Sequence, residues 1–257
     1  MKNLGFFENI QNWFIQTYES LRSQFILNFI NSDRWKSLLQ GLGVTLQITL
    51  FAVLIGIVIG IIVASIRSTY DKNKEALARK GGPGYVVLKI LNALCNLYLT
   101  IIRGTPVVVQ LMIAYFIIFA SSRNGTLIAI IAFGINSGAY VAEIFRSGIL
   151  SVDNGQFEAG RSLGLSYVQT MFHIILPQAF KSVLPTLCNE FIVLLKETSV
   201  AGYVGVTDLT KAGDLIRGRT FSAFMPLIAV ALIYLLMVII LTALVRMLER
   251  RLRKSER

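Results

Sequence analysis

The chain has 257 residues, of which 54% are hydrophobic and 15% are charged, and its formal net charge is +11. A soluble domain carries about 25% charged residues, so this composition argues against the two or so soluble domains that the length alone would suggest. The mean hydropathy of +0.65, together with long uncharged apolar runs of about the length of a membrane helix, predicts one all-α domain that is embedded in a membrane.

Residues 1–40 mix hydrophobic with polar side chains. The hydrophobic positions include Trp13 and Phe14, and the polar ones include Gln11, Gln16 and Glu19. A pattern this polar is typical of a helix that lies in the membrane interface and does not cross the bilayer. The segment also lacks the small-residue cleavage site of a signal peptide. We therefore expect an N-terminal amphipathic segment, a membrane domain at 41–250 and a basic cytoplasmic tail at 251–257.

Long apolar segments follow along the chain. A helix needs about 20 apolar residues to cross roughly 30 Å of hydrocarbon, which predicts spans at about 43–67, 85–121, 124–149 and 220–246. The first span carries Gly56 and Gly60 at the spacing that lets two membrane helices approach closely. The higher glycine content of membrane helices explains the same residues, and the sequence leaves both interpretations open.

The second span is longer than a straight helix allows. Residues 90–122 contain one charged residue, Arg103, and would form a helix about 50 Å long. Pro106 predicts a break, because proline removes a backbone donor and its ring clashes with the preceding turn. We expect a helix over 85–103 that enters from the interface and continues after the break as the second span.

A polar segment at 151–180 interrupts the apolar pattern and carries a spaced motif. The pattern is Glu-Ala-Ala, three residues, Gly, nine residues, Ile-x-Leu-Pro, and the matching residues are Glu158, Ala159, Gly164, Ile174, Leu176 and Pro177. It resembles the EAA loop of ABC importer permeases, with Gly160 in place of the second alanine. The resemblance implies a short cytoplasmic coupling helix that docks on a separate ATPase through Glu158, Ala159, Gly160, Gly164, Leu176 and Pro177.

A fifth span at 182–207 is less apolar than the others. It follows from sidedness, because basic residues concentrate on the cytoplasmic side of membrane proteins. Two basic clusters follow the first span and the last span. They comprise Arg67, Lys72, Lys74, Arg79, Lys80, Arg246, Arg250, Arg251, Arg253, Lys254 and Arg257. Both clusters lie on the same side of the membrane as the loop at 151–180 only if 182–207 crosses the membrane. We predict five spans, with the N-terminus outside and the C-terminus in the cytoplasm. Four basic residues count against an external N-terminus: Lys2, Arg22, Arg34 and Lys36.

Three further motifs narrow the family resemblance. They read Arg-Gly-Thr-Pro at 103–106, Gly-Ala-Tyr-Val-Ala-Glu-Ile at 138–144 and Leu-Leu-Lys-Glu-Thr-Ser at 194–199. All three resemble the polar amino-acid branch of ABC importer permeases, although Glu197 departs from the aspartate that is more usual there. The resemblance covers about 40–245 and implies a pathway-forming subunit in a bacterial plasma membrane. It also implies a second permease subunit, two ATP-binding subunits that hold ATP and Mg, and an extracytoplasmic binding protein.

The residues give less support to other functions. No GxxxxGK[ST] motif occurs, so we expect no enzyme activity or cofactor in this chain and place ATP hydrolysis on the partner. The excess positive charge lies at span ends, where it orients the chain and meets anionic lipid, which argues against nucleic acid. Cys95 and Cys188 have no metal-ligand spacing. A secondary transporter would usually show internal repeats, and a lipid-modifying enzyme would need clustered catalytic groups, but both stay as alternatives.

Charged residues within the third span are candidates for substrate contact, because a charge in the bilayer is costly unless it is paired. Glu143 and Arg146 share one helix face, with Asn136 and Tyr140 within two turns before them. An arginine and a glutamate would complement the carboxylate and ammonium groups of an amino acid. The alternative is that Glu143 and Arg146 neutralise each other near the cytoplasmic end.

The 182–207 segment offers a second set of candidates. Lys196 and Glu197 lie deep in the predicted span, and Glu190 precedes them by about two turns. They contact either the substrate or the second permease subunit. The sequence ranks none of these residues, and it leaves open which amino acid is carried and whether the two permease subunits are identical.

Overall fold

The computed structural model describes residues 2–80 and 82–254, and every regular element in these ranges is helical. The first half forms α1 (Lys2–Phe25), η1 (Ile26–Ile30), η2 (Asn31–Asp33), α2 (Trp35–Lys80), α3 (Pro83–Gly104), α4 (Val107–Ile113), η3 (Ala114–Ile118) and α5 (Gly125–Leu150). The second half forms α6 (Asn154–Ser162), α7 (Tyr167–Thr170), η4 (Met171–Ile175), α8 (Leu176–Glu197), η5 (Thr198–Val204), α9 (Leu209–Thr220) and α10 (Phe224–Lys254). Residues 255–257 of the expected basic tail lie outside the described residues.

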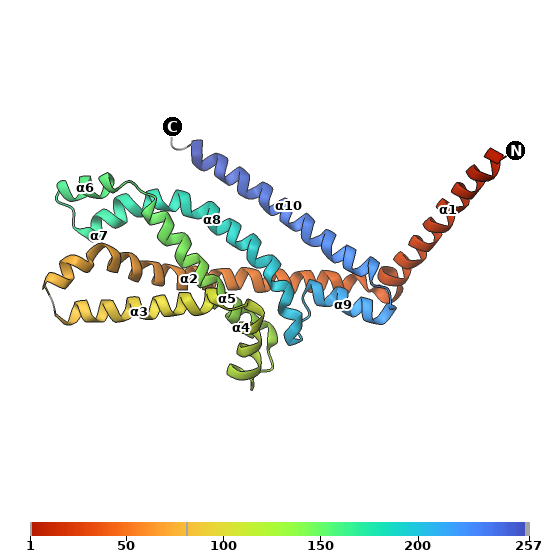
Figure 1. Ribbon diagram of the computed structural model, residues 1–257, viewed down its shortest axis with the longest axis horizontal. Coiled ribbons are helices and arrows are strands. Elements are labelled where there is room, and N and C mark those ends of the chain that lie inside the picture. The colour runs from red at the N-terminus through yellow and green to blue at the C-terminus, as the bar shows by residue number, and fades with distance from the viewer. Residues whose placement is uncertain (1, 81, 255–257) are drawn as a thin grey trace.

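The longest element is α2, whose 46 residues extend over about 69 Å at 1.5 Å per residue. Figure 1 shows α3 beside the C-terminal part of α2, α5 crossing it, and α1 projecting from its start. The predicted first span is the middle of this helix. α2 starts at Trp35, inside the segment that the sequence assigned to the N-terminal region. It continues beyond the span because residues 61–80 contain neither glycine nor proline to interrupt it.

α2 and α5 pack closely through small residues. A Cβ atom at Gly60 would lie 2.5 Å from Val141 Cγ1, and one at Gly56 would lie 2.9 Å from Ser137 Oγ. Both distances are shorter than real Cβ contacts, so these two positions require glycine where the helices meet. Of the two interpretations of the glycine pair, the structure supports the close approach of two helices.

The break expected at Pro106 separates α3 from α4. Thr105 is extended, with φ −123° and ψ 147°, which is the conformation that proline favours in the residue before it. The side-chain amide of Gln110 donates to the carbonyl oxygen of Ile102 and to Thr105 Oγ1, at 2.8 Å in both cases. Gln110 thereby satisfies backbone and side-chain acceptors at the end of α3. The break is confirmed, while a single crossing for 85–121 stays a prediction.

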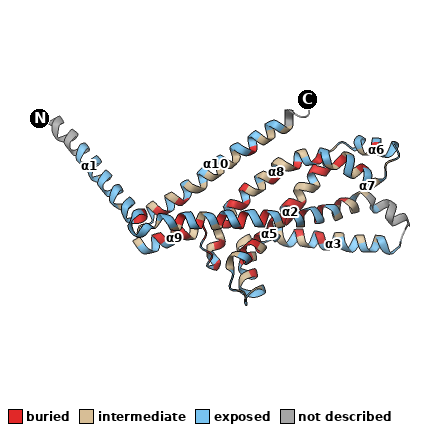
Figure 2. Cartoon of the chain, turned by 180° about the vertical axis from the view of Figure 1, so that it is seen from behind, coloured by how far each residue is buried: buried red, intermediate tan, exposed pale blue. Residues whose placement is uncertain are grey.

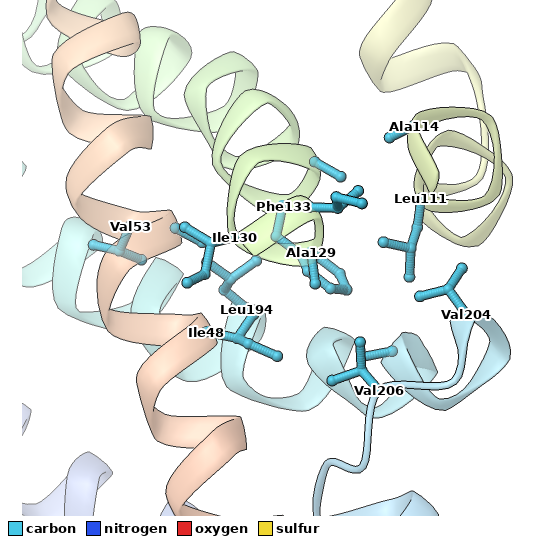
Figure 3. Close-up of a cluster of buried hydrophobic side chains, with 14 residues drawn as sticks. Ile48, Val53, Leu111, Ala114, Ala129, Ile130, Phe133, Leu194, Val204 and Val206 are labelled. Atoms are coloured by element: carbon cyan, nitrogen blue, oxygen red, sulfur yellow. The ribbon is translucent and has the colours of Figure 1, made fainter. Parts of the chain in front are cut away.

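The largest core cluster lies where six elements meet. Figure 3 shows side chains from α2, α4, η3, α5, α8 and the segment around η5 converging on one apolar centre. Phe133 and Leu194 are fully buried there, and Val204 and Val206 close one side. Residues between Ile48 and Val206 therefore share one core, which agrees with a single membrane domain.

Four stretches of the described chain are long and apolar enough to cross a membrane: Gln11–Lys72, Pro83–Gly104, Gly125–Leu150 and Phe224–Leu252. The sequence-predicted spans at 43–67, 124–149 and 220–246 fall largely within three of them. α8 has 22 residues but contains four charged ones and is not among the four stretches. Five crossings therefore stay a prediction. α10 begins at Phe224 because α9 continues to Thr220 and Phe221 then adopts a φ of 52°.

The long helices differ in how much of their surface the chain itself covers. Most of α5 is buried, whereas α1, α3 and α10 expose most of their side chains, as Figure 2 shows. Exposed leucines and isoleucines recur along α3 and α10. Contiguous apolar surface of this kind is expected where a helix faces lipid or another subunit.

Candidate functional site

The segment expected to couple to an ATPase contains a short helix with defined ends. Asp153 caps α6 by accepting a hydrogen bond from the Gly155 amide at 2.6 Å. At the other end Gly164 has a φ of 80°, and the Leu165 amide donates to the carbonyl oxygen of Gly160 at 3.2 Å. This is the left-handed glycine ending typical of helix C-termini. A short helix is therefore present in this segment, as the resemblance implies, and Gly164 follows its end.

Aromatic contacts hold α6 against the ends of α2 and α7. The rings of Phe157 and Tyr167 lie 5.4 Å apart, and the Lys72 ammonium group lies 4.6 Å from the Phe157 ring centre. Burial raises the pKa of the Tyr167 hydroxyl, and a hydrogen bond with Thr69 partly offsets that shift. Phe157 also packs on the cluster that contains Ile149 at the end of α5. α6 is thus fixed to two of the long helices.

Gly160 departs from the alanine of the family motif, and its surroundings explain why. A Cβ atom at this position would lie 2.6 Å from Thr170 Cγ2 and 3.0 Å from Ile174 Cδ1. Gly160 is buried, so the helix approaches α7 and η4 through a position without a side chain. The glycine weakens the helix locally but permits this contact.

The opposite face of the segment is exposed. Glu158 and Ala159 are exposed, and the Leu163 side chain, which the sequence did not single out, is 79% exposed. Leu176 is half-buried and Pro177 is exposed in the first turn of α8, where proline is tolerated. This face combines an acidic residue with an apolar one and is open to a partner.

Glu143 lies in a network of ion pairs that the sequence identified only in part. Its Oε1 atom is 2.5 Å from Arg67 Nη1 and 3.7 Å from Arg103 Nη1, while Oε2 is 4.0 Å from Arg146. Arg67 comes from α2 and Arg103 from α3, so Glu143 connects three helices. Mutual neutralisation of Glu143 and Arg146 is therefore only a minor part of the arrangement.

Arg146 has a partner that the sequence analysis missed. Its Nη2 and Nε atoms donate to Asp71 Oδ2 at 3.0 and 3.3 Å. Asp71 lies on the part of α2 that extends beyond the predicted span, and 75 residues separate it from Arg146. No local spacing could have indicated this pair.

The remaining candidates on α5 bind neighbouring helices. Asn136 is buried and donates to Gln110 Oε1 at 2.9 Å, which links α5 to the break after α3. The Tyr140 ring lies 5.8 Å from the guanidinium carbon of Arg103. Ser137 donates to Glu190 Oε1 of α8 at 2.9 Å. The sequence did not identify Gln110 or Ser137, although Gln110 follows Pro106 by one helical turn, a position from which a side chain can reach the interrupted backbone.

Lys196 and Glu197 end α8, and the chain then continues as the 3₁₀ turn η5. Lys196 is exposed and Glu197 is half-buried. Neither residue has an ion pair within 4.0 Å among the described residues. The structure thus separates the candidates into the paired charges on α5 and two charges at the end of α8. In the described part of the chain, no group of three or more His, Cys, Asp or Glu residues is placed to hold a metal ion.

The fold and these sites define a class: a multi-helix membrane protein with an exposed helical segment between two of its long helices. The family model described as "Binding-protein-dependent transport system inner membrane component" matches residues 83–254, and the chain belongs to that family. Membership makes it a multi-pass inner-membrane protein and the permease subunit of an importer, which is not itself the ATPase. The predicted importer permease is confirmed, and nothing supports the secondary transporter or the lipid-modifying enzyme.

Curated relatives and solved structures agree with this assignment. The glutamine transport system permease GlnP of Escherichia coli K12 is 39% identical over 168 residues, which cover 64% of this chain and 77% of GlnP. The arginine transport system permease ArtQ of Bacillus subtilis is 37% identical over 166 residues, which cover 63% of this chain and 76% of ArtQ.

Two solved transporters share the fold. The crystal structure of an amino acid ABC transporter with histidines matches with a TM-score of 0.74 and 36% identity, covering 87% of this chain and 98% of that one. A chain of the inward-facing MetNI methionine ABC transporter, at 20% identity and a TM-score of 0.69, covers 84% of this chain and 95% of that one.

Proposed function

We propose that this chain forms the translocation pathway of an ATP-driven importer for a polar amino acid. The observation that carries the proposal is its 36% identity, over 87% of its length, to a chain of the amino acid ABC transporter crystallised with histidines. Relatives named for glutamine and arginine transport support the same substrate class. The motifs at 103–106, 138–144 and 194–199 add to this support.

The importer is expected to contain several partners. They are a second permease subunit of the same or a related kind, two ATP-binding subunits that hold ATP and Mg, and an extracytoplasmic binding protein. The exposed face of α6 supports coupling through Glu158, Ala159, Gly160, Gly164, Leu176 and Pro177. The predicted five-span topology places the N-terminus outside and the C-terminus in the cytoplasm.

Lys196 and Glu197 are the best supported candidates for direct contact with the amino acid. Neither residue has an ion pair within 4.0 Å among the described residues. If α8 is a span, an unpaired charge in it is costly unless a ligand or another subunit supplies its partner. Lys196 would take the carboxylate, and Glu197 with Glu190 would take the ammonium group or a basic side chain. Pairing across the permease dimer is the alternative for these charges.

Two measurements test the proposal. The permease is expressed with its ATP-binding subunits and binding protein in cells that lack amino-acid uptake, and uptake of each of the common amino acids is measured. We expect ATP-dependent uptake of at least one polar amino acid, and copurification of the ATP-binding subunits with the permease. A complex that copurifies but takes up no amino acid would overturn the substrate class and leave the importer assignment intact.

A further inference from the structure

A cavity of about 400 Å³ lies where the end of α3 meets α2 and α5. Its lining includes Arg67 from α2, Asn96, Thr100 and Arg103 from α3, and Glu143 from α5. These are polar groups in a part of the chain that is otherwise rich in leucine and isoleucine. The cavity is separate from the two charges that end α8.

The charges in and beside the cavity do not balance, whether or not the neighbouring pair Arg146 and Asp71, which lies outside the lining, is counted. Three guanidinium groups, those of Arg67, Arg103 and Arg146, face the two carboxylates of Glu143 and Asp71, which leaves one positive charge in excess among these five residues. Arg67 and Arg146 each contact a carboxylate within 3.0 Å. Arg103 reaches only Glu143 Oε1, at 3.7 Å, and that atom already accepts from Arg67. The excess charge is therefore located mainly on Arg103.

Arg103 is placed to bind a ligand. Its side chain is 47% exposed, and its guanidinium carbon lies 5.8 Å from the Tyr140 ring centre, which favours a planar cation on that face. A guanidinium group has five N–H donors in a fixed plane and binds carboxylate or phosphate oxygens with two parallel hydrogen bonds.

A row of polar side chains along α3, called the polar stripe here, ends at the cavity. Spacings of three and four residues place five polar side chains on one face of this helix: Lys89, Asn92, Asn96, Thr100 and Arg103. The stripe is about 21 Å long. Exposed apolar residues occupy much of the remaining surface of α3, including Leu91 and Leu94. A polar stripe on a membrane helix faces a pathway or protein rather than lipid.

We propose that this cavity is a second oxyanion-binding site on the path, distinct from Lys196, in which Arg103 holds the carboxylate of the transported amino acid as it moves along α3. The inference rests on the proposed function. Glu143 Oε2 has its nearest cation at 4.0 Å, so it retains acceptor capacity for the ammonium group of the same molecule. An acidic phospholipid would offer the same oxyanion chemistry through its phosphate, and the experiment separates these two sources.

Thiol chemistry inside the cavity provides the test. Thr100→Cys is made in a chain in which Cys95 and Cys188 are replaced by serine, and the permease–ATPase complex is placed in phosphatidylcholine nanodiscs. The rates of modification by an anionic and by a cationic methanethiosulfonate reagent are compared. Arg103 changes the thiolate fraction equally for both reagents, so the ratio of their rates reports the charge of the cavity alone.

We expect the anionic reagent to react faster by roughly five- to tenfold, and Arg103→Gln to bring the ratio near one. Arg123→Gln, the same change at an exposed arginine outside the cavity, should leave the ratio unchanged. The transported amino acid should slow modification of Thr100→Cys, whereas its α-carboxamide should not. Protection that requires phosphatidylglycerol in the nanodisc, and that no amino acid provides, would assign the oxyanion site to lipid.

A ratio that Arg103→Gln does not change would overturn the proposal, as would a cysteine that neither ligand protects. The rate ratio needs no transport, so its failure is distinct from failure of the proposed function. Uptake by the wild-type complex decides the function separately.

Discussion

At Gly160 two effects of one methyl group oppose each other. Alanine is favoured over glycine within a helix by about 1 kcal/mol, but a Cβ atom here would lie 2.6 Å from Thr170 Cγ2. Overpacking of this kind costs about 1–3 kcal/mol. We therefore predict that Gly160→Ala lowers the melting temperature of the permease–ATPase complex. Adding Thr170→Ser, which removes the obstructing methyl group, should restore it.

Thr170→Ser alone serves as the control for this pair, because serine keeps the hydroxyl that donates to the Ser166 carbonyl oxygen. An unchanged melting temperature for Gly160→Ala would mean that Thr170 moves aside without cost.

The two carboxylates near Arg146, those of Asp71 and Glu143, can be compared by how strongly each is coupled to it. Arg146 makes two hydrogen bonds to Asp71 but only approaches Glu143 to 4.0 Å. We predict that a double-mutant cycle with Asp71→Asn and Arg146→Gln gives a coupling energy of a few tenths to about 1 kcal/mol, because both side chains are partly exposed to screening. The cycle with Glu143→Gln and Arg146→Gln should give a smaller coupling energy. Thermal unfolding of the four variants in each cycle measures both, and equal couplings would contradict the assignment of partners.

The residues that the sequence missed share one physical property. Glu143 and Arg146 were recognised because they are charges within an apolar segment, where burial is costly. Their partners Arg67, Asp71 and Arg103 belong to other helices, and only tertiary packing brings them within 4 Å. A helical repeat reports which residues share a face, but it does not report which helix covers that face.

Among the elements, α6 offers the clearest test of coupling. Gly164 has a φ of 80° and no atom within 4 Å of the position of a Cβ, so a substitution there acts through the backbone alone. Alanine in this left-handed conformation costs about 1–2 kcal/mol. We predict that Gly164→Ala inserts normally but reduces both uptake and copurification of the ATP-binding subunits. Uptake assays and quantitative pull-down measure the two effects.

Gly218→Ala is the matched control for this change. Gly218 also has nothing within 4 Å of its Cβ position, but its φ is not in the left-handed region. Transport at the wild-type rate by both variants would show that the end of α6 does not transmit the force of ATP hydrolysis.

Element boundaries were predictable where a local rule fixes them. Pro106 breaks the second span, Asn124 caps α5 by accepting from the Leu127 amide, and Gly164 ends α6. The length of α2 was not predictable, because hydropathy marks the part of a helix that lies in hydrocarbon and not the polar turns that continue it. The conversion of α8 into η5 after Glu197 likewise has no proline or glycine at the transition.

For the molecule as a whole, the topology depends on whether α8 crosses the membrane. Its 22 residues extend over about 33 Å, which is enough for a bilayer core of roughly 30 Å. Its four charges make that crossing costly unless they face a pathway or a partner. The distribution of basic residues favours the crossing. Labelling of single cysteines can test the crossing, but each cysteine must be placed at an exposed position. Ser68, near the predicted cytoplasmic end of the first span, is buried and therefore unsuitable.

Cysteine labelling in intact cells decides this topology. In a chain without Cys95 and Cys188, we predict that an impermeant thiol reagent labels Arg123→Cys from outside and reaches Ser166→Cys only after permeabilisation. A third reporter is Arg219→Cys on α9. Arg123, Ser166 and Arg219 are all exposed. If α8 crosses, Arg219→Cys labels from outside like Arg123→Cys, because one crossing separates it from the coupling segment. If Arg219→Cys is instead shielded together with Ser166→Cys, α8 stays on one side and the five-span topology is wrong.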